Sequence, residues 1–257
     1  LGTQTPEFDD ITLFYGVPTT QAINDIFILS SSDIWAVAGS GQILHYNGTS
    51  WLLNQDVGAE NLYGIAMVSA TDGWAVGASG KIYHYNGATW SEFTDTGTTS
   101  WNSIAMVSVT SGWIVGSGGA ILSYNGTSWS SSTSPTASAL NDIEIVAASD
   151  LWAVGDTGVI IRYNGTSWSL ITTAGINLES VSKISASDVW ASGASGNIWR
   201  WNGTSWSLFQ DTGTQTWYAV DMPSSVDGWV VGNGGAIYHF NGASWVSATS
   251  PTGSQLN

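Results

Sequence analysis

The sequence predicts an all-β fold, a six-bladed β-propeller made of four-stranded antiparallel blades. The first observation is a segment related to Asp-x-Trp-Ala-Val-Gly that occurs six times, with its Trp residues 39, 39, 39, 38 and 39 residues apart. The second is another Trp sixteen residues after each of these, and the third is an Asn-Gly pair just before that second Trp. The two Trp series are Trp35, Trp74, Trp113, Trp152, Trp190 and Trp229, and Trp51, Trp90, Trp129, Trp168, Trp206 and Trp245.

Each copy is long enough for four short strands. In the fourth copy they are expected at 141–146, 152–155, 159–163 and 167–171, with Gly-rich or Asn-Gly turns between them. Such regular spacing indicates an all-β fold, and Asn-Gly favours a two-residue type I′ hairpin because both central residues need a positive φ. Four strands in about 39 residues is the size of one propeller blade. The propeller is therefore predicted over residues 23–257, with repeats at about 23–61, 62–100, 101–139, 140–177, 178–216 and 217–255.

Apolar residues fall on both faces of each predicted sheet. A lone sheet of this kind would not stay soluble, whereas radial stacking of the sheets buries both faces. We expect the repeated Trp residues to be mostly core. An Ile that recurs in strand three is expected to face one neighbouring blade; it is Ile43, Ile82, Ile121, Ile160, Ile198 and Ile237.

The composition excludes several classes of protein. The chain has 257 residues, with Lys+Arg 4, Asp+Glu 19, no Cys and a formal net charge of -15. Without Cys there is no thiol catalysis, zinc finger or iron–sulfur cluster, and four cations cannot form the basic groove that a nucleic-acid backbone requires. No run approaches the roughly 18 apolar residues of a membrane span. We expect neither a nucleic-acid partner nor a membrane span, and a surface rich in Ser, Thr and Asn with almost no Lys favours an extracellular or cell-surface location.

A second period spans three copies. Asp95-Thr-Gly-Thr98 matches Asp211-Thr-Gly-Thr214, and Ser134-Pro-Thr136 matches Ser250-Pro-Thr252, in both cases 116 residues later. The six copies are therefore interpreted as a duplicated unit of three blades.

The N-terminal segment, residues 1–22, contains a surplus outer strand. Ile11-Thr-Leu-Phe14 is similar to Trp206-Ser-Leu-Phe209, so seven candidates for a fourth strand accompany six blades. Three roles are open to Ile11, Thr12, Leu13 and Phe14: to close the ring, to lie across it, or to pair with another molecule. An exposed strand edge is a template for such pairing, so strand donation between subunits is one hypothesis.

A carboxylate stands two residues before the first Trp of most copies. A ring of calcium ligands is one interpretation. The other, which the single Ser favours, is that each side chain accepts backbone N–H bonds in the turn between strands one and two. The residues are Asp33, Asp72, Ser111, Asp150, Asp188 and Asp227.

The three His residues, His45, His84 and His239, share one position of strand three. Zinc ligands must converge within about 2.0–2.1 Å of the ion, whereas successive blades turn these side chains about the axis and hold them apart. We expect a polar position near a blade edge and no metal site.

Departures from the repeat indicate a binding face. The loops from strand four to strand one, and from two to three, lie on one face of a propeller. There the chain has Asp56, Asp95 and Asp211, together with Trp101 and Trp217 where other copies have Ile or Leu. Such residues suit a sugar, because a Trp ring offers a large contact area beside hydrogen-bonding groups. The alternative is that both Trp residues begin strand one and pack inward.

Four of the Asn-Gly turns are N-glycosylation acceptors of the form Asn-x-Thr. They are Asn47, Asn125, Asn164 and Asn202, whereas Asn86 and Asn241 are followed by Gly-Ala. In a secreted chain we expect glycans to project from these turns.

The repeat resembles the Asp-box and bacterial-neuraminidase repeat group of propellers, and the related photosystem-assembly-factor type. The similarity rests on Gly-Trp-Ala-Val-Gly, Gly-x-Ile and an Asn-Gly turn that ends at Trp, as in residues 72–90. The Asn-Gly-Thr-Ser-Trp turn lacks the Asp-x-Gly spacing of a true Asp-box. Sialidases of that group bind a carboxylate through three arginines, whereas this chain has only Arg162 and Arg200. The resemblance implies the architecture without sialidase activity, and we expect no enzyme, no catalytic residues and no cofactor.

The sequence thus favours a non-catalytic extracellular or cell-surface propeller that binds a glycan or protein partner. Several bacterial propeller lectins also carry Trp-rich blades, a resemblance that supports carbohydrate binding and adhesion. The alternative is a structural subunit of a surface layer or filament, a self-assembling homo-oligomer or polymer. The loop Trp and Asp residues favour the first function, and the surplus strand favours the second.

The two functions predict different masses in solution. Strand donation predicts an assembly that falls apart when residues 1–16 are removed while the fold persists. A binding module predicts a monomer of 27.0 kDa with the full chain and an unchanged oligomeric state after truncation. Light scattering of both forms distinguishes them, and a size unaffected by the truncation would end the donation hypothesis.

Overall fold

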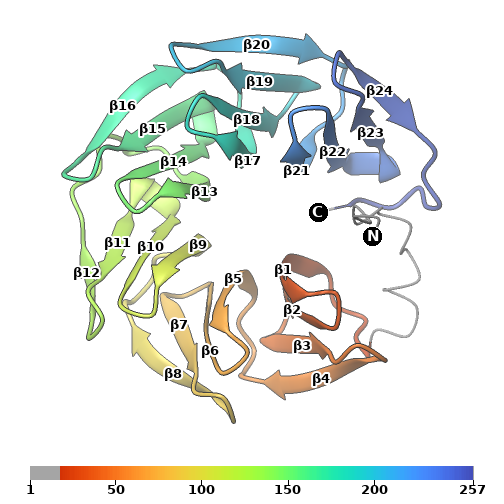
Figure 1. Cartoon of the computed structure of the whole chain (residues 1–257). Coiled ribbons are helices and arrows are strands. Elements are labelled where there is room, and N and C mark those ends of the chain that lie inside the picture. The colour runs from red at the N-terminus through yellow and green to blue at the C-terminus, as the bar shows by residue number, and fades with distance from the viewer. Residues whose placement is uncertain (1–17, 257) are drawn as a thin grey trace, which may run out of the picture.

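The computed structural model describes residues 18–256. They form six four-stranded antiparallel sheets arranged radially around a central opening (Figure 1). In each sheet the strands follow one another in chain order, with the first strand nearest the axis and the fourth at the rim. The predicted six-bladed β-propeller is confirmed.

The blades are numbered along the chain. Blade 1 contains β1 (Ile23–Ser30), β2 (Asp33–Ala38), β3 (Gln42–Tyr46) and β4 (Trp51–Asp56). Blade 2 contains β5 (Leu62–Ser69), β6 (Asp72–Gly77), β7 (Lys81–Tyr85) and β8 (Trp90–Asp95). Blade 3 contains β9 (Trp101–Ser108), β10 (Ser111–Gly116), β11 (Ile121–Tyr124) and β12 (Trp129–Ser131).

The second half repeats this arrangement. Blade 4 contains β13 (Leu140–Ala147), β14 (Asp150–Gly155), β15 (Val159–Tyr163) and β16 (Trp168–Thr173). Blade 5 contains β17 (Leu178–Ser185), β18 (Asp188–Gly193), β19 (Asn197–Trp201) and β20 (Trp206–Asp211). Blade 6 contains β21 (Trp217–Ser224), β22 (Asp227–Gly232), β23 (Ile237–Phe240) and β24 (Trp245–Ala248). Within the described part, helix is limited to the single 3-10 turns η2 (Ser117–Gly119), η3 (Asp156–Gly158) and η4 (Asn233–Gly235).

Three aromatic rings join each of the first five blades to the next one. Between blades 1 and 2, Trp35 lies 5.0 Å from Tyr85 and 5.8 Å from Trp90, measured between ring centroids. The two indole planes meet at 66°, an edge-to-face contact of the kind that aromatic quadrupoles favour. The equivalent groups are Trp74–Tyr124–Trp129, Trp113–Tyr163–Trp168, Trp152–Trp201–Trp206 and Trp190–Phe240–Trp245.

The core predictions hold in the first five blades. The first Trp of each of these blades is at most 8% exposed, and the recurring Ile of strand three is at most 2% exposed. Ile43 packs in a cluster with Leu62 and Ile65 of the next blade, as a residue facing one neighbour should. In blade 6 the corresponding Ile237 is only half-buried.

The Asn-Gly pairs do not form the predicted two-residue turn. β3 ends at Tyr46 and pairs there with Trp51, so four residues form the connection. The Asn47 side-chain oxygen accepts the N–H groups of Thr49 and Ser50, both at 3.0 Å, and only Gly48 takes a positive φ, of 87°. The type I′ prediction was wrong because Asn closes a longer turn with its own side chain.

The carboxylates before the first Trp bind a side chain rather than the turn. Asp33 accepts a hydrogen bond from His45 in strand three at 2.8 Å, and Asp150 holds Arg162 by two bonds of 2.6 and 2.8 Å. The turn N–H groups are instead accepted by a Ser at the end of strand one, as with Ser30. The remaining pairs are Asp72–His84, Asp188–Arg200 and Asp227–His239, so these five Asp residues bind every His and Arg of the chain.

Each of these pairs also covers the first Trp of its blade. The His45 ring stacks on Trp35 with centroids 4.1 Å apart, and the Arg162 guanidinium lies 4.8 Å from the Trp152 ring centroid. Blade 3 has Ser111 and Ser123 at the two positions, so it lacks the pair. The pair therefore closes one side of the Trp core with a polar, hydrogen-bonded layer.

The predicted N-terminal strand, residues 11–14, lies outside the described residues. Within them, Thr19 beside blade 1 contacts Gln42, and the far end, Leu256, hydrogen-bonds to Gly232 of blade 6. The described chain thus begins and ends at the junction between blades 6 and 1 (Figure 1).

The Asp–Arg pair predicts a measurable stability effect. Replacing Asp150 with Ala removes two charged hydrogen bonds and leaves the Arg162 guanidinium without its acceptor, which should lower the free energy of unfolding by about 1–3 kcal/mol. Ser111→Ala at the matching position of blade 3 should change it by less than about 0.5 kcal/mol. Urea denaturation measures both, and equal effects of the two substitutions would contradict the assignment.

Candidate functional site

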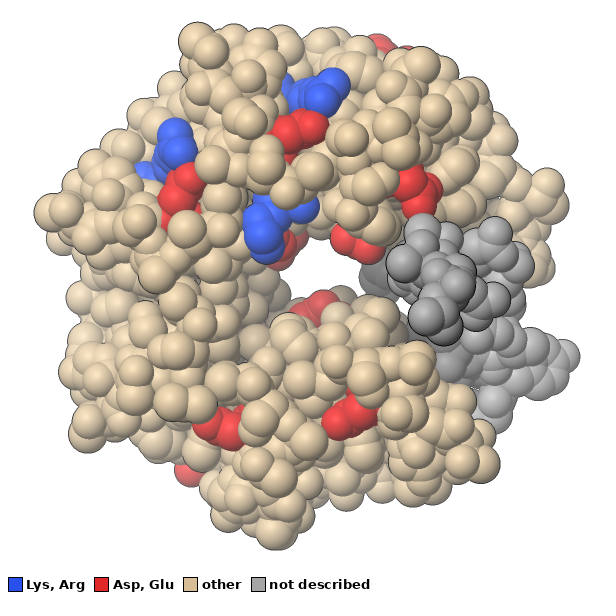
Figure 2. Space-filling view, in the orientation of Figure 1, with Lys and Arg blue, Asp and Glu red and all other residues tan. Residues whose placement is uncertain are grey.

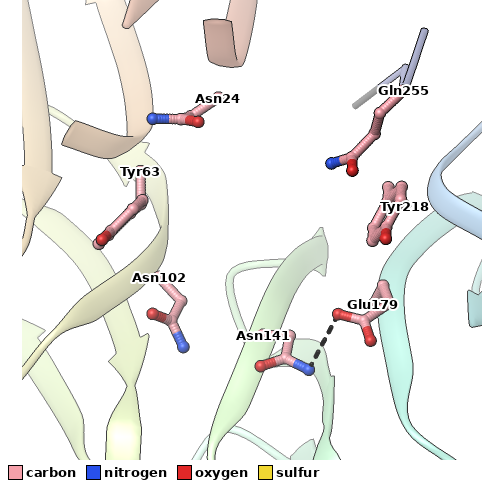
Figure 3. Close-up of a pocket in the computed structure, with 7 residues that line it drawn as sticks. All are labelled: Asn24, Tyr63, Asn102, Asn141, Glu179, Tyr218 and Gln255. Carbon is pink, nitrogen blue, oxygen red and sulfur yellow. Dashed lines mark hydrogen bonds between the residues drawn. The ribbon is translucent and has the colours of Figure 1, made fainter. Parts of the chain in front are cut away.

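Six polar side chains, one from each blade, encircle one mouth of the central channel. They are the second residues of the six innermost strands, and with one further residue they surround a cavity of about 360 Å³ (Figure 3). We call this set the mouth ring; it consists of Asn24, Tyr63, Asn102, Asn141, Glu179, Tyr218 and Gln255. Because the blades converge at the axis, side chains from every blade can meet around the central channel.

A β-bulge places these residues at the channel. In β5 the pairing with β6 shifts between Leu62 and Gly64, so that the residue between them, Tyr63, has no partner opposite. The same shift occurs at the start of every innermost strand. A bulge re-aims a side chain, and here it turns the second residue toward the axis, whereas the first, such as Leu62, is fully buried between blades.

The Asn residues of the mouth ring also connect the blades. The side-chain N–H groups of Asn24 and Asn102 donate to the main-chain carbonyls of Leu62 and Leu140, at 2.7 and 2.9 Å. Asn141 donates in the same way to Leu178 at 2.9 Å. The nitrogen of each amide is thereby fixed, which leaves its oxygen as an acceptor oriented by the fold.

The mouth ring carries negative charge. Glu179 is half-buried and accepts a hydrogen bond of 3.4 Å from Asn141 (Figure 3). Burial raises the pKa of the Glu179 carboxyl, and the charge of Asp156 raises it further. Lys and Arg are missing from the described residues that line the cavity. The site therefore suits neutral polar or cationic groups.

Two carboxylates lie one residue further along the innermost strands. Asp25 accepts the N–H groups of Ile26 and Ile65, each at 2.8 Å, and so ties blade 1 to blade 2. Burial raises the pKa of Asp25 to about 7, to which the charge of Asp142 contributes in the same direction. At neutral pH this carboxyl is therefore near its titration midpoint.

Asp142 joins three blades. One oxygen accepts Ser103 Oγ at 2.9 Å and the other accepts Ser180 Oγ at 3.1 Å, from blades 3 and 5. The main-chain N–H groups of Ile143 and Val181 add two bonds of 2.8 Å. Burial still raises the pKa of the Asp142 carboxyl, although these four donors oppose the rise.

Deeper acidic residues complete the channel lining. Glu144 forms an ion pair with Lys183, and burial raises the pKa of Glu144 and of Asp221. Acidic side chains accordingly gather around the central opening (Figure 2). Together with Glu179 they give the channel an excess of negative charge.

The residues predicted from sequence to bind a ligand lie elsewhere. Trp101 and Trp217 are 2% and 0% exposed, and each indole N–H donates to a Thr hydroxyl, Thr96 or Thr212, at 2.9 Å. They therefore offer no ring face to a ligand, and the alternative that they begin strand one and pack inward is what the structure shows.

The three predicted Asp residues close turns at the rim. Asp56, Asp95 and Asp211 end the outer strands β4, β8 and β20. Each accepts the N–H of the Gly two residues later, at 3.0, 2.8 and 2.8 Å, and Asp95 also binds Lys81. They lie on three different blades, and Asp95 and Asp211 directly precede Thr96 and Thr212, the residues that accept the indole N–H groups of Trp101 and Trp217.

The described residues also bear on glycosylation, metal binding and membrane spans. The acceptors Asn47, Asn125, Asn164 and Asn202 are exposed, as glycosylation requires, and their modification stays a prediction. Across residues 18–256 no group of three or more His, Asp or Glu side chains is placed to hold a metal ion. The described chain also contains no helix that is long and apolar enough to cross a membrane.

The sequence did not single out the mouth ring. Six of its seven members follow an apolar residue at the start of strand one, at a bulge that interrupts the alternation of side chains between the two faces. The usable signal was that this second position is polar or phenolic in all six copies although its identity varies. Repeated core positions, by contrast, vary little.

Comparison with known proteins supports the architecture. Neither a protein-family model nor a curated protein matches the sequence. Among solved structures, YCF48 from Cyanidioschyzon merolae is similar over 92% of this chain and 88% of its own, with 16% identity and a TM-score of 0.72. YCF48 bound to D1 peptide aligns over 90% and 82%, with 17% identity and a TM-score of 0.71. The extracellular domain of a B. thetaiotaomicron one-component system aligns over 87% and 32%, with 14% identity and a TM-score of 0.70.

The raised pKa of Asp25 predicts a pH-dependent stability. The folded state binds this proton more tightly than the unfolded state, whose carboxyl has a value near 3.8. Stability is therefore greatest when Asp25 is protonated and falls as pH rises toward and through about 7, with at most about 1.4 kcal/mol per pH unit from one group. Urea denaturation from pH 5 to 8 should show this fall.

Asp25→Asn should flatten the dependence on pH, because the variant has no proton to lose at that position. Burial also raises the pKa of Asp142, Glu144 and Asp221, so part of the slope of stability against pH should remain. Asp56→Asn at the rim is the matched control and should leave the slope unchanged. Parallel wild-type and Asp25→Asn profiles would contradict the prediction.

Proposed function

We propose that the protein is a non-catalytic binding module of the extracellular space or a cell surface, and that its mouth ring binds a basic peptide segment of a protein partner. The observation that carries this proposal is the cavity of about 360 Å³ at the channel mouth, surrounded by amide, phenol and carboxylate groups. Ligand sites in proteins are concave and contain a few convergent polar groups.

A peptide main chain matches the groups of the mouth ring. It presents N–H donors and C=O acceptors, and Asn and Gln side chains pair with both kinds. Tyr63 and Tyr218 add amphipathic ring surface of the type enriched at protein interfaces. The site therefore has both the polar and the apolar elements of peptide recognition.

Charge favours a basic partner. Glu179 gives the mouth ring its carboxylate, and the channel below holds Asp25, Asp142 and Asp221. The whole chain carries a formal charge of -15, which attracts cationic groups and speeds their association. A neutral glycan gains nothing from this field, so a Lys- or Arg-containing segment is the better fit.

Similarity offers support of a general kind. The fold of this chain is that of YCF48, a protein described bound to a peptide. At 17% identity this likeness concerns the fold, and propellers serve many functions. The shared fold agrees with a protein partner, whereas the proposed class of ligand rests on the residues of the mouth ring.

The remaining parts of the proposal rest on composition and on the site. The extracellular location is supported by a Lys-poor chain that is rich in Ser and Thr. A non-catalytic role is supported by the single carboxylate that lines the described mouth ring, since glycoside hydrolysis requires two that flank one sugar bond.

The mouth ring predicts a preference that can be measured. A library of immobilised peptides with a fixed Lys or Arg should retain the protein, whereas peptides with a fixed Asp or Glu should not. For a retained peptide, Glu179→Gln should weaken binding about tenfold and reduce its dependence on salt, because it removes a charged hydrogen-bond acceptor. Isothermal titration calorimetry measures both effects.

Asp211→Asn is the matched control, because it removes one negative charge at the rim and leaves the mouth ring intact. It should bind the peptide as the wild type does. Retention on a neutral glycan array in place of basic peptides would overturn the peptide assignment in favour of a glycan. Equal losses in Glu179→Gln and Asp211→Asn would show that the mouth ring is not the site.

A further inference from the structure

The negative charge of the mouth ring lies on one side of the cavity. Glu179 is the one carboxylate among the described residues that line it. Glu179 of β17 and Tyr218 of β21 are the second residues of innermost strands in neighbouring blades. A hydrogen bond of 3.3 Å from the Val220 N–H to Ser180 Oγ ties these two strands together. Figure 3 shows Glu179 and Tyr218 on the same side of the cavity, across from Tyr63.

Glu179 retains most of its capacity to accept hydrogen bonds. Among the described residues, its side chain accepts one bond, from Asn141 Nδ2 at 3.4 Å. The two N–H groups of that amide also serve the Leu178 carbonyl at 2.9 Å and Asp156 at 3.2 Å. A carboxylate can accept about four hydrogen bonds, and Asp142 deeper in the channel does accept four. Glu179 is therefore available to donors from a ligand.

Tyr218 has an aromatic ring that the packing between blades does not use. Strand-three residues such as Tyr85 and Tyr124 lie against the first Trp of the preceding blade, with ring centroids 5.0 and 4.9 Å apart. Tyr218 is half-buried, lines the cavity and takes part in none of the ring contacts between described residues. Its ring is therefore available to a ligand beside Glu179.

The blades already contain a carboxylate and an aromatic ring that hold an Arg side chain together. Arg162 donates two hydrogen bonds to Asp150, at 2.6 and 2.8 Å, and its guanidinium lies 4.8 Å from the Trp152 ring centroid. The equivalent group in blade 5 is Arg200–Asp188–Trp190. All cation–ring contacts between described residues involve Arg, whereas the two Lys residues form ion pairs with carboxylates alone.

We propose that the mouth ring selects Arg over Lys in its basic partner segment, with Glu179 accepting two hydrogen bonds from the guanidinium and the Tyr218 ring stacking on its flat face. This inference rests on the proposed function and adds the identity of the bound side chain. A guanidinium has a planar fork of N–H groups that matches a carboxylate and a face that stacks on aromatic rings, whereas an ammonium group is a compact, strongly hydrated charge. Tyr218 is therefore a specificity-determining residue.

The other side of the mouth ring is neutral and suits the main chain of the ligand. Asn24, Tyr63 and Asn102, from blades 1 to 3, offer amide and phenol groups to the cavity. These groups can pair with peptide N–H and C=O groups, but they carry no charge that would hold a cation. The Arg side chain should therefore lie over blades 5 and 6, which gives the bound peptide one orientation.

The test uses the tightest-binding peptide from the library of immobilised basic peptides, synthesised with Arg, Lys or citrulline at the fixed position. Citrulline keeps the planar shape of Arg and removes its charge. By isothermal titration calorimetry the wild-type protein should bind the Arg version at least about tenfold more tightly than the other two, because charge-assisted bidentate hydrogen bonds are stronger than neutral ones. In Tyr218→Leu and in Glu179→Gln, the ratio of the Arg and Lys affinities should fall toward one.

Tyr63→Leu is the matched control, because it removes the same kind of ring from the neutral side of the cavity. Both Tyr residues stand at β-bulges, so both variants should keep the thermal midpoint of the wild type. Tyr63→Leu should weaken the Arg and Lys versions by the same factor and so preserve their ratio.

Two results would overturn the inference. One is a wild-type protein that binds the Lys version as tightly as the Arg version or more tightly, and the other is an equal fall of the ratio in Tyr218→Leu and Tyr63→Leu. In both cases weaker binding by Glu179→Gln would still support the proposed function. Retention of no basic peptide at all would overturn the proposed function and the Arg preference together.

Discussion

The structure depends on one constraint: every blade is apolar on both faces and is soluble only when a neighbour covers each of them. The ring of sheets meets this requirement, and a triplet of aromatic rings makes the contact specific at each of the five junctions from blade 1 to blade 6. A residue in strand one or two of a blade can therefore change its chemical character between copies only where its side chain lies outside the contact between neighbouring blades. Chemical variation is therefore confined to the axis, the turns and the rim.

At the axis a second constraint applies, because innermost strands of different blades cannot pair as one sheet. Side chains supply the missing hydrogen bonds, as when Asn24 donates to Leu62 and Asp142 accepts from Val181. Carboxylates used in this way are taken from water, which raises the pKa of Asp25 and Asp142. The polar and acidic character of the channel thus follows from how the blades are joined, and a binding site at its mouth inherits that charge.

The sequence predicted what depends on period and missed what depends on bulges and long-range partners. The 39-residue step between copies and the alternation of apolar and polar residues around Trp35 were sufficient to predict the blades and their core residues. The partner of Asp33, His45, is twelve residues away in strand three, yet the pairing left a signal, since Asp accompanies His or Arg and Ser111 accompanies Ser123. The mouth ring left a weaker signal in the sequence. A bulge at Tyr63 interrupts the alternation of side chains between the two faces, and sequence reasoning relies on that alternation.

The mouth ring follows from departures within the repeat. There the copies differ at one equivalent position, as Tyr63, Asn102 and Glu179 do, so the ring is asymmetric and can hold a ligand in one orientation. The core positions of the same strands are constrained by the contact between blades and stay apolar, as Ile65, Ile104 and Ile143 do. The repeat therefore builds one shared scaffold, and the residues that leave the contact between blades give the channel mouth a chemistry of its own.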